Sequence, residues 1–205
     1  MTEAARERSA NIGRLKLVAL IGAFAGPLLL ATVWFALIDP QGEVDTRNNG
    51  QLIEPAWPLE DFSLRLADGG AFGLDELRGH WTLVYFAGGD CAEQCVQNLY
   101  HMRQVRLSLH KRMHRVQRLY IGAPLGDELA GEHPGLLLAD GPQGSDDAGE
   151  LRGQFDAAEA QLGPLPQAIY LVDPLGNLMM RFDPALDPRK MLKDLKHLLR
   201  VSRIG

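Results

Sequence analysis

The longest apolar stretch of the chain lies near its N-terminus. Residues 17–38 contain no charged side chain, and a helix of this length, rising about 1.5 Å per residue, reaches roughly 30 Å, the thickness of a bilayer core. The flanking charges are Arg6, Arg8, Arg14 and Lys16 before the stretch, and Asp39, Glu43 and Asp45 after it. Basic flanks stay in the cytoplasm. We therefore expect a cytoplasmic segment at 1–16 and one transmembrane helix at 17–38, a single-pass anchor in the inner membrane that places the C-terminal part in the periplasm.

A cleaved signal peptide is the alternative interpretation of the same stretch. Its apolar region is usually about 7–15 residues and ends in a small-residue cleavage motif, which the sequence FALIDPQG does not offer. The uncleaved anchor is therefore preferred.

The next segment, residues 39–58, carries proline, glycine and asparagine without an apolar period and is predicted to be a linker. An ordered arm packed on the domain is an equal alternative for its last ten residues. Beyond it, residues 59–205 are expected to form one periplasmic domain.

Strands and helices alternate along residues 59–205. Apolar positions alternate around two glycines at 62–74, which predicts a hairpin. Dense apolar runs predict strands at 81–87, 116–123, 135–140, 167–173 and 178–182, and helical periodicity predicts helices at 99–118, 147–162 and 187–202. This order predicts a mixed α/β sheet flanked by helices.

The net charge of the chain limits the classes of molecule it can bind. A net charge of −5 and a pI of about 5.7 argue against nucleic-acid binding, which usually requires a basic excess. Within this acidic chain the predicted 99–118 helix carries basic residues and no acid. These are Arg103, Arg106, Lys111, Arg112, Arg115 and Arg118. A solvated helix face explains them; docking to an acidic partner or anionic lipid is the functional alternative.

The only two cysteines of the chain, Cys91 and Cys95, stand where a predicted strand gives way to a helix. The positive end of a helix dipole favours a thiolate there, so Cys91 is the expected nucleophile, although the adjacent carboxylate of Asp90 opposes the thiolate and leaves the sign of the net effect open. Cys95 lies one turn further on, and the pair can close a disulfide or hold a soft ion such as Cu(I). A structural zinc site would need four ligands. A redox or copper-binding pair is preferred over a static disulfide or two inert thiols.

Two segments carry a family resemblance. LRGHWTLVYFAGGDCAEQC resembles the part of the Sco/SenC family in which a strand leads to a C-x-x-x-C motif, and YLVDPLGNLMMRF resembles that family's penultimate hairpin. The similarity covers roughly residues 55–203. It implies a thioredoxin-like fold and a role in building the copper centre of cytochrome c oxidase. By position, Cys91 and Cys95 match the family's two copper-binding or redox-active cysteines.

The sequence also departs from that family. Val96 follows the second cysteine in place of proline, and Gly89 and Asp90 precede the first. The family's distal histidine ligand falls on Leu165, so no third copper ligand is expected there. Pro166, beside it, is a candidate for the cis-proline that faces the cysteines in many thioredoxin folds; an ordinary trans proline that caps a strand is an equal alternative.

We therefore expect a membrane-anchored, Sco-related protein that assists assembly of a haem-copper oxidase by thiol–disulfide exchange, with Cu(I) handling as a second activity of the same cysteines. The expected partner is an oxidase subunit or another assembly factor. The alternative is a non-catalytic binding module that docks on an oxidase subunit and keeps a structural disulfide.

Overall fold

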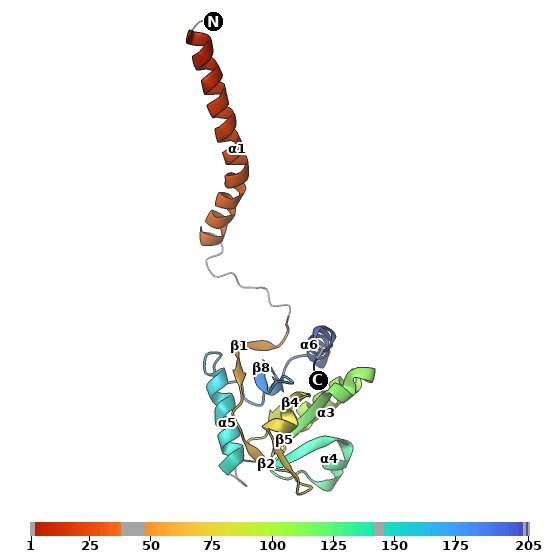
Figure 1. Cartoon of the computed structure of the whole chain (residues 1–205). Coiled ribbons are helices and arrows are strands. Elements are labelled where there is room, and N and C mark those ends of the chain that lie inside the picture. The colour runs from red at the N-terminus through yellow and green to blue at the C-terminus, as the bar shows by residue number, and fades with distance from the viewer. Residues whose placement is uncertain (1–2, 38–47, 142–145, 203, 205) are drawn as a thin grey trace. The chain divides into compact units, whose positions relative to one another are not determined.

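The computed structural model describes residues 3–37, 48–141, 146–202 and 204 (Figure 1). The chain divides into two compact units, Met1–Arg47 and Asn48–Gly205. In the first unit, α1 (Glu3–Leu37) is a continuous helix with Pro27 inside it. Residue 38 of the predicted anchor and residues 39–47 of the predicted linker lie outside the described residues. Among the described helices, none combines the length and apolar character that crossing a bilayer requires.

The second unit is built on a six-stranded sheet of order β1-β8-β7-β4-β5-β6. Its strands are β1 (Gln51–Pro58), β4 (Trp81–Phe86), β5 (Val116–Gly122), β6 (Leu136–Asp140), β7 (Ile169–Val172) and β8 (Asn177–Phe182). Strands β4, β5 and β6 are parallel, whereas β7, β8 and β1 each pair antiparallel with their neighbours. Burial of both faces explains why β4, β5 and β7 are nearly continuous apolar runs. The mixed α/β sheet predicted from the sequence is confirmed.

Helices cover both faces of this sheet (Figure 1). On one face, α3 (Glu93–Leu107) and α6 (Pro188–Val201) pack side chains such as Leu99 and Leu195 onto the sheet. On the other, α5 (Asp146–Glu159) buries Phe155 against Phe86 of β4 and Tyr170 of β7. The short helices α2 (Leu74–Leu77) and α4 (Asp127–Glu132) and the 3₁₀ helix η1 (His110–Arg115) connect these elements.

The predicted hairpin is also confirmed. Strands β2 (Ser63–Arg65) and β3 (Ala71–Gly73) pair antiparallel around a turn in which Gly69 adopts a positive φ of 86°. The hairpin reaches β6 through a bridge between Leu66 and Ala139 and through the amide of Ala67, which donates to the carbonyl of Leu138 at 2.8 Å.

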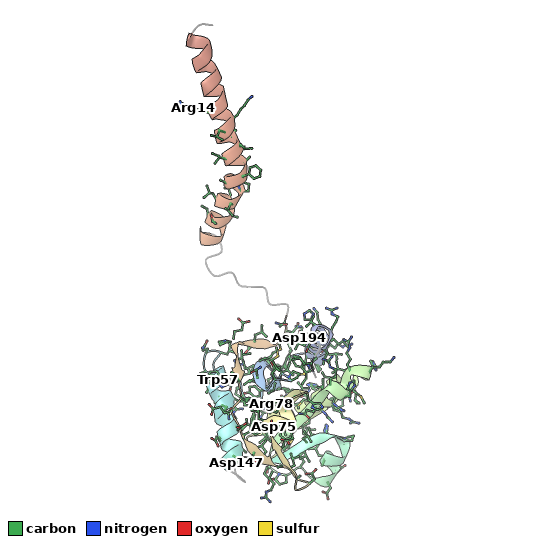
Figure 2. All side chains as sticks on the ribbon, in the orientation of Figure 1. Arg14, Trp57, Asp75, Arg78, Asp147 and Asp194 are labelled. Atoms are coloured by element: carbon green, nitrogen blue, oxygen red, sulfur yellow. A yellow bond between two sulfur atoms is a disulfide. The ribbon has the colours of Figure 1, made fainter. Side chains whose placement is uncertain are left out.

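The predicted linker at 39–58 is wrong at its C-terminal end, because residues 51–58 form the edge strand β1. Asp194 lies on α6 (Figure 2). It is 3% exposed and holds the residues just before this strand in place. Its carboxylate accepts hydrogen bonds from the amides of Asn49 and Gly50 at 2.7 and 2.9 Å. The folded unit therefore begins before residue 59, as the alternative of an ordered arm proposed.

The predicted helix at 99–118 is too long. Helix α3 ends at Leu107, η1 follows, and β5 begins at Val116. Arg118, on which the two predictions overlapped, therefore lies on the predicted strand rather than on a helix face, with 1% of its surface exposed.

Candidate functional site

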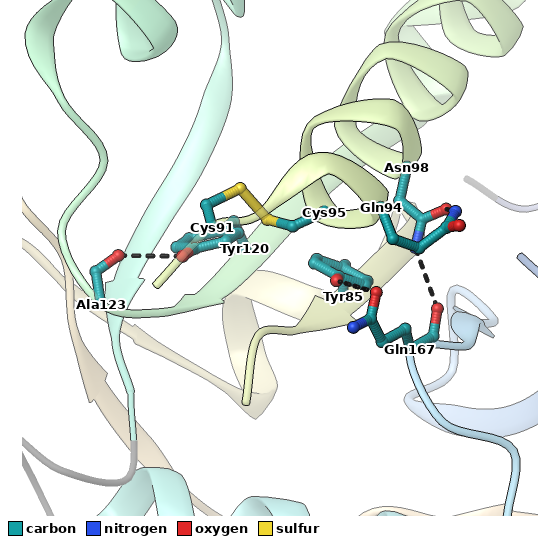
Figure 3. The surroundings of a disulfide bond; sticks show 8 residues. All are labelled: Tyr85, Cys91, Gln94, Cys95, Asn98, Tyr120, Ala123 and Gln167. Atoms are coloured by element: carbon teal, nitrogen blue, oxygen red, sulfur yellow. Dashed lines mark hydrogen bonds between the residues drawn. A yellow bond between two sulfur atoms is a disulfide. The ribbon is translucent and has the colours of Figure 1, made fainter. Parts of the chain in front are cut away.

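Cys91 and Cys95 form a disulfide, with their Cα atoms 5.2 Å apart (Figure 3). Strand β4 ends at Phe86 and α3 begins at Glu93, after Ala92 as its N-cap. Cys91 therefore stands in the connecting loop, and Cys95 lies in the first turn of the helix. The junction predicted from the sequence is where the pair is found.

The two sulfur-bearing residues differ in exposure. Cys95 is buried at 3% exposure within the core under α3, whereas Cys91 is half-buried. A macromolecular thiol or disulfide can approach only the outer residue directly. The geometry thus gives Cys91 the accessible position and Cys95 the protected one.

Two tyrosines on neighbouring strands pack into the same cluster as the disulfide. Tyr85 of β4 and Tyr120 of β5 are paired in register, and their ring centroids are 6.3 Å apart. The hydroxyl of Tyr120 donates to the carbonyl of Ala123 at 2.9 Å. Burial, reinforced by Tyr85 and Asp90, raises the pKa of Tyr120 to about 12. Burial also raises the pKa of Tyr85, against a smaller opposing effect of the Asn98 amide. Both tyrosines are therefore neutral near pH 7.

A polar bridge links α3 to the loop before β7 (Figure 3). Asn98 is fully buried and donates through its amide to the carbonyl of Gln167 at 3.0 Å, while Gln94 donates to Asn98 at 3.1 Å. The Gln167 side chain accepts from the Tyr85 hydroxyl at 3.4 Å. This network holds the 163–168 loop against the helix that carries Cys95.

Sequence reasoning missed these four residues, Tyr85, Asn98, Tyr120 and Gln167. One signal was readable, since Asn98 is a polar residue between apolar positions of the helical stripe that buries Cys95 and Met102. Gln167 has a positive φ of 59°, which nothing in its local sequence indicates.

Leu165 and Pro166 do not lie as the resemblance implied. Leu165 packs against the core cluster on the α5 side of the sheet, whereas the disulfide belongs to the cluster on the α3 side. Glu54–Pro55 is the only cis peptide bond among the described residues, so Pro166 is an ordinary trans proline, the second of the two alternatives that the sequence left open. Gln167, rather than Leu165, is the residue of this loop that reaches the disulfide helix.

The donor set around the disulfide does not fit a Cu(II) centre. Within the described ranges, no group of three or more His, Cys, Asp or Glu side chains converges as metal ligands would. Cu(II) prefers nitrogen and oxygen donors in a tetragonal arrangement, and two sulfurs alone suit only the softer Cu(I).

A central mixed sheet between helices, with a C-x-x-x-C pair at the N-terminus of the first covering helix, defines a thioredoxin-like protein. The family described as "Transmembrane-like, thioredoxin-like, C-terminal domain" matches residues 81–202, and the chain belongs to this family. No curated protein sequence matches the chain significantly.

Solved Sco structures share the fold. Copper-bound yeast Sco1 is 18% identical with a TM-score of 0.58, the alignment covering 73% of this chain and 96% of that one. Apo Sco1 from Thermus thermophilus is 21% identical with a TM-score of 0.59, covering 74% and 96%. BsSco, described as a Sco-family cytochrome c oxidase assembly protein with a disulfide switch, is 16% identical with a TM-score of 0.53, covering 72% and 96%. The resemblance to the Sco/SenC family predicted from the sequence is confirmed at the level of the fold.

Proposed function

We propose that the chain is a membrane-anchored thiol–disulfide oxidoreductase that acts in the assembly of a haem-copper respiratory oxidase. The observation that carries this proposal is the asymmetric Cys91–Cys95 disulfide at the start of α3, half-buried at one cysteine and buried at the other. An outer nucleophile with a protected second thiol is the arrangement that exchange through a mixed disulfide needs.

In the reducing direction, the Cys91 thiolate attacks a partner disulfide. A bond forms between Cys91 Sγ and one partner sulfur, and the partner's S–S bond breaks, releasing a thiolate that takes up a proton. Cys95 then loses its proton and attacks Cys91 Sγ, which releases the second partner thiol and closes the Cys91–Cys95 disulfide. Two electrons pass to the partner, and the chain ends in the oxidised form that the structure holds.

The protein surroundings support this exchange. The neutral tyrosines Tyr85 and Tyr120 place no negative charge under the disulfide near pH 7. The N-terminus of α3 offers unpaired backbone N–H groups that favour a thiolate on the cysteine beside them. Both effects lower the energy of the reduced, ionised pair, and the negative charge of Asp90, which directly precedes Cys91, opposes them.

Oxidase assembly is proposed from the Sco neighbours, whose descriptions name copper binding, a disulfide switch and oxidase assembly. An oxidase subunit or another assembly factor is the proposed partner. Because the third copper ligand is missing from the described donor set, exchange of thiols is preferred here to delivery of Cu(II).

Trapping tests the exchange. A Cys95→Ser variant lacks the resolving thiol, so it should accumulate mixed disulfides through Cys91 that migrate as larger species on non-reducing gels and collapse on reduction. Cys91→Ser is the matched control, which keeps one thiol but places it in the buried position and should trap little. If neither variant traps a partner and both support normal oxidase assembly, the chain is a binding module with a structural disulfide.

The membrane anchor and periplasmic location are proposed from the apolar run at 17–38 and its basic N-terminal flank. A reporter enzyme that works only outside the cytoplasm, fused after Gly205, should be active. Activity from a cytoplasm-dependent reporter at the same position would contradict both the location and the redox role, since thiols in the cytosol are kept reduced.

A further inference from the structure

Arg118 of β5 is an unusual buried cation. Only 1% of its surface is exposed, and one of its nitrogens, Nη2, donates to the carbonyl of Pro134 at 2.8 Å. Its Nε and Nη1 atoms are buried and have no hydrogen-bond partner. A guanidinium carries five N–H donors, so most of its hydrogen-bonding capacity is left unused away from water.

Neighbouring positive charges further disfavour the protonated form of Arg118. Burial and then the positive charges of Arg106 and Arg103 lower its pKa to about 10, which still leaves it protonated near pH 7. Both of these arginines are on α3 and are partly exposed. In the described part of the chain, the ion pairs are formed by Arg78, Arg152 and Arg181, and none involves these three arginines.

Arg181 shows how the same fold satisfies a buried guanidinium. It is 2% exposed and pairs with Glu159 at 2.7 Å. It also donates to Gln51 and to the carbonyls of Leu162 and Gly163. Arg118, in contrast, has no carboxylate partner among the described residues.

A second buried polar group without a hydrogen-bond partner belongs to His133, the residue before Pro134. His133 follows α4 directly and precedes Pro134, the residue whose carbonyl Arg118 contacts. It is 3% exposed, and its Nδ1 is buried without a partner. Burial, then the charges of Arg118 and Arg103, lower its pKa, against a smaller opposing effect of Glu132. Two unpartnered polar side chains from different elements thus meet in one positive environment.

Unpaired buried charges are expensive, and proteins that keep them normally supply a counter-charge. We propose that Arg118 and His133, together with Arg103 and Arg106, bind a small oxyanion of the phosphate type between α3 and the α4–β6 connection. The ligand must be small because the orphaned nitrogens are buried. Arg103 and Arg106 are partly exposed and provide the route by which the ion exchanges with solvent. Guanidinium groups match the oxygens of such ions in bidentate geometry.

Titration of the full chain, purified in detergent, with inorganic phosphate near pH 7 tests this site. Calorimetry should show saturable binding of about one phosphate per chain, with sodium chloride at equal ionic strength as the reference for screening. Arg118→Met, which keeps a long apolar side chain but removes the donors, should weaken binding at least about tenfold. Arg103→Gln should weaken it in the same direction, and the exposed hairpin variant Arg65→Gln should leave it unchanged.

A nonspecific effect of phosphate would give a different result. Phosphate also stabilises folded proteins nonspecifically by exclusion from their surface, and that effect rises without saturation and is equal in all variants. Binding heats that do not saturate as phosphate is added, or equal phosphate affinity in the parent chain and Arg118→Met, would therefore disprove the site. Should Arg118→Met fail to fold, Arg103→Gln decides, because unchanged affinity in that partly exposed variant rejects the proposal.

Discussion

Replacing Asp194 by alanine should destabilise the folded unit by removing the clamp on the start of β1. The carboxylate accepts from the amides of Asn49 and Gly50 and from the Asn49 side chain at 2.7, 2.9 and 2.7 Å. A hydrogen bond to a charged group contributes about 1.5–3 kcal/mol, and a stranded buried donor costs about 1–3 kcal/mol. Because the three bonds share one acceptor and do not add fully, we expect a loss of about 3 kcal/mol in the free energy of unfolding, which corresponds to a melting temperature about 6–12 °C lower.

The matched control is Asp187→Ala on the same helix. Asp187 is exposed and accepts one hydrogen bond, from the amide of Arg189 at 2.8 Å, as the N-cap of α6. Loss of a helix cap costs about 1 kcal/mol. Urea denaturation of the full chain, followed by tryptophan fluorescence, compares the two variants. If Asp194→Ala costs no more than Asp187→Ala, the N-terminal arm is not docked on α6 and the linker extends further toward residue 58 than the structure shows.

Three further outcomes are expected. Asn98→Leu, which keeps the side-chain volume but frees the Gln167 carbonyl, should cost about 1 kcal/mol and raise hydrogen exchange in the 163–168 loop; unchanged exchange would contradict the bridge. Burial and then the charge of Arg118 lower the pKa of His133 in the folded chain, so His133 takes up a proton more readily in the unfolded chain. The free energy of unfolding should therefore fall as the pH drops below about 6.5. His133→Asn should make that fall smaller in urea titrations from pH 7 to 5. The reduced chain should hold Cu(I) through two thiolates but bind Cu(II) weakly in chelator competition, and Leu165→His should improve Cu(II) binding little, since Leu165 packs against the opposite core cluster.

The sheet and most of its helices could be predicted because their signals are local. Apolar runs located β4, β5 and β7, and the glycine turn located the β2–β3 hairpin. The cysteine pair was found for the same reason, since both residues stand in one short segment.

The errors arise where distant contacts decide the structure. Ile53 is the only fully buried residue of strand β1, so the sequence of this strand shows no apolar period. The strand forms because β8 and Asp194 hold it in place. The predicted helix was extended to Arg118 along a run of basic residues, although Arg118 also lies in the predicted 116–123 strand, and pairing with β4 and β6 places it in the sheet. Leu165 was matched by counting without gaps, and the turn at Gln167 changes which side chain faces α3.

The hairpin beside β6 has a consequence for solubility. Strand β6 ends the sheet on one side, and an uncovered edge presents unpaired backbone groups on which a second molecule can add a strand. The bridge from Leu66 to Ala139 and the bond from Ala67 to Leu138 occupy part of that edge from within the same chain. The β2–β3 hairpin therefore disfavours self-association through the β6 edge. A protein held at high local concentration on a surface would benefit most from a partly covered edge.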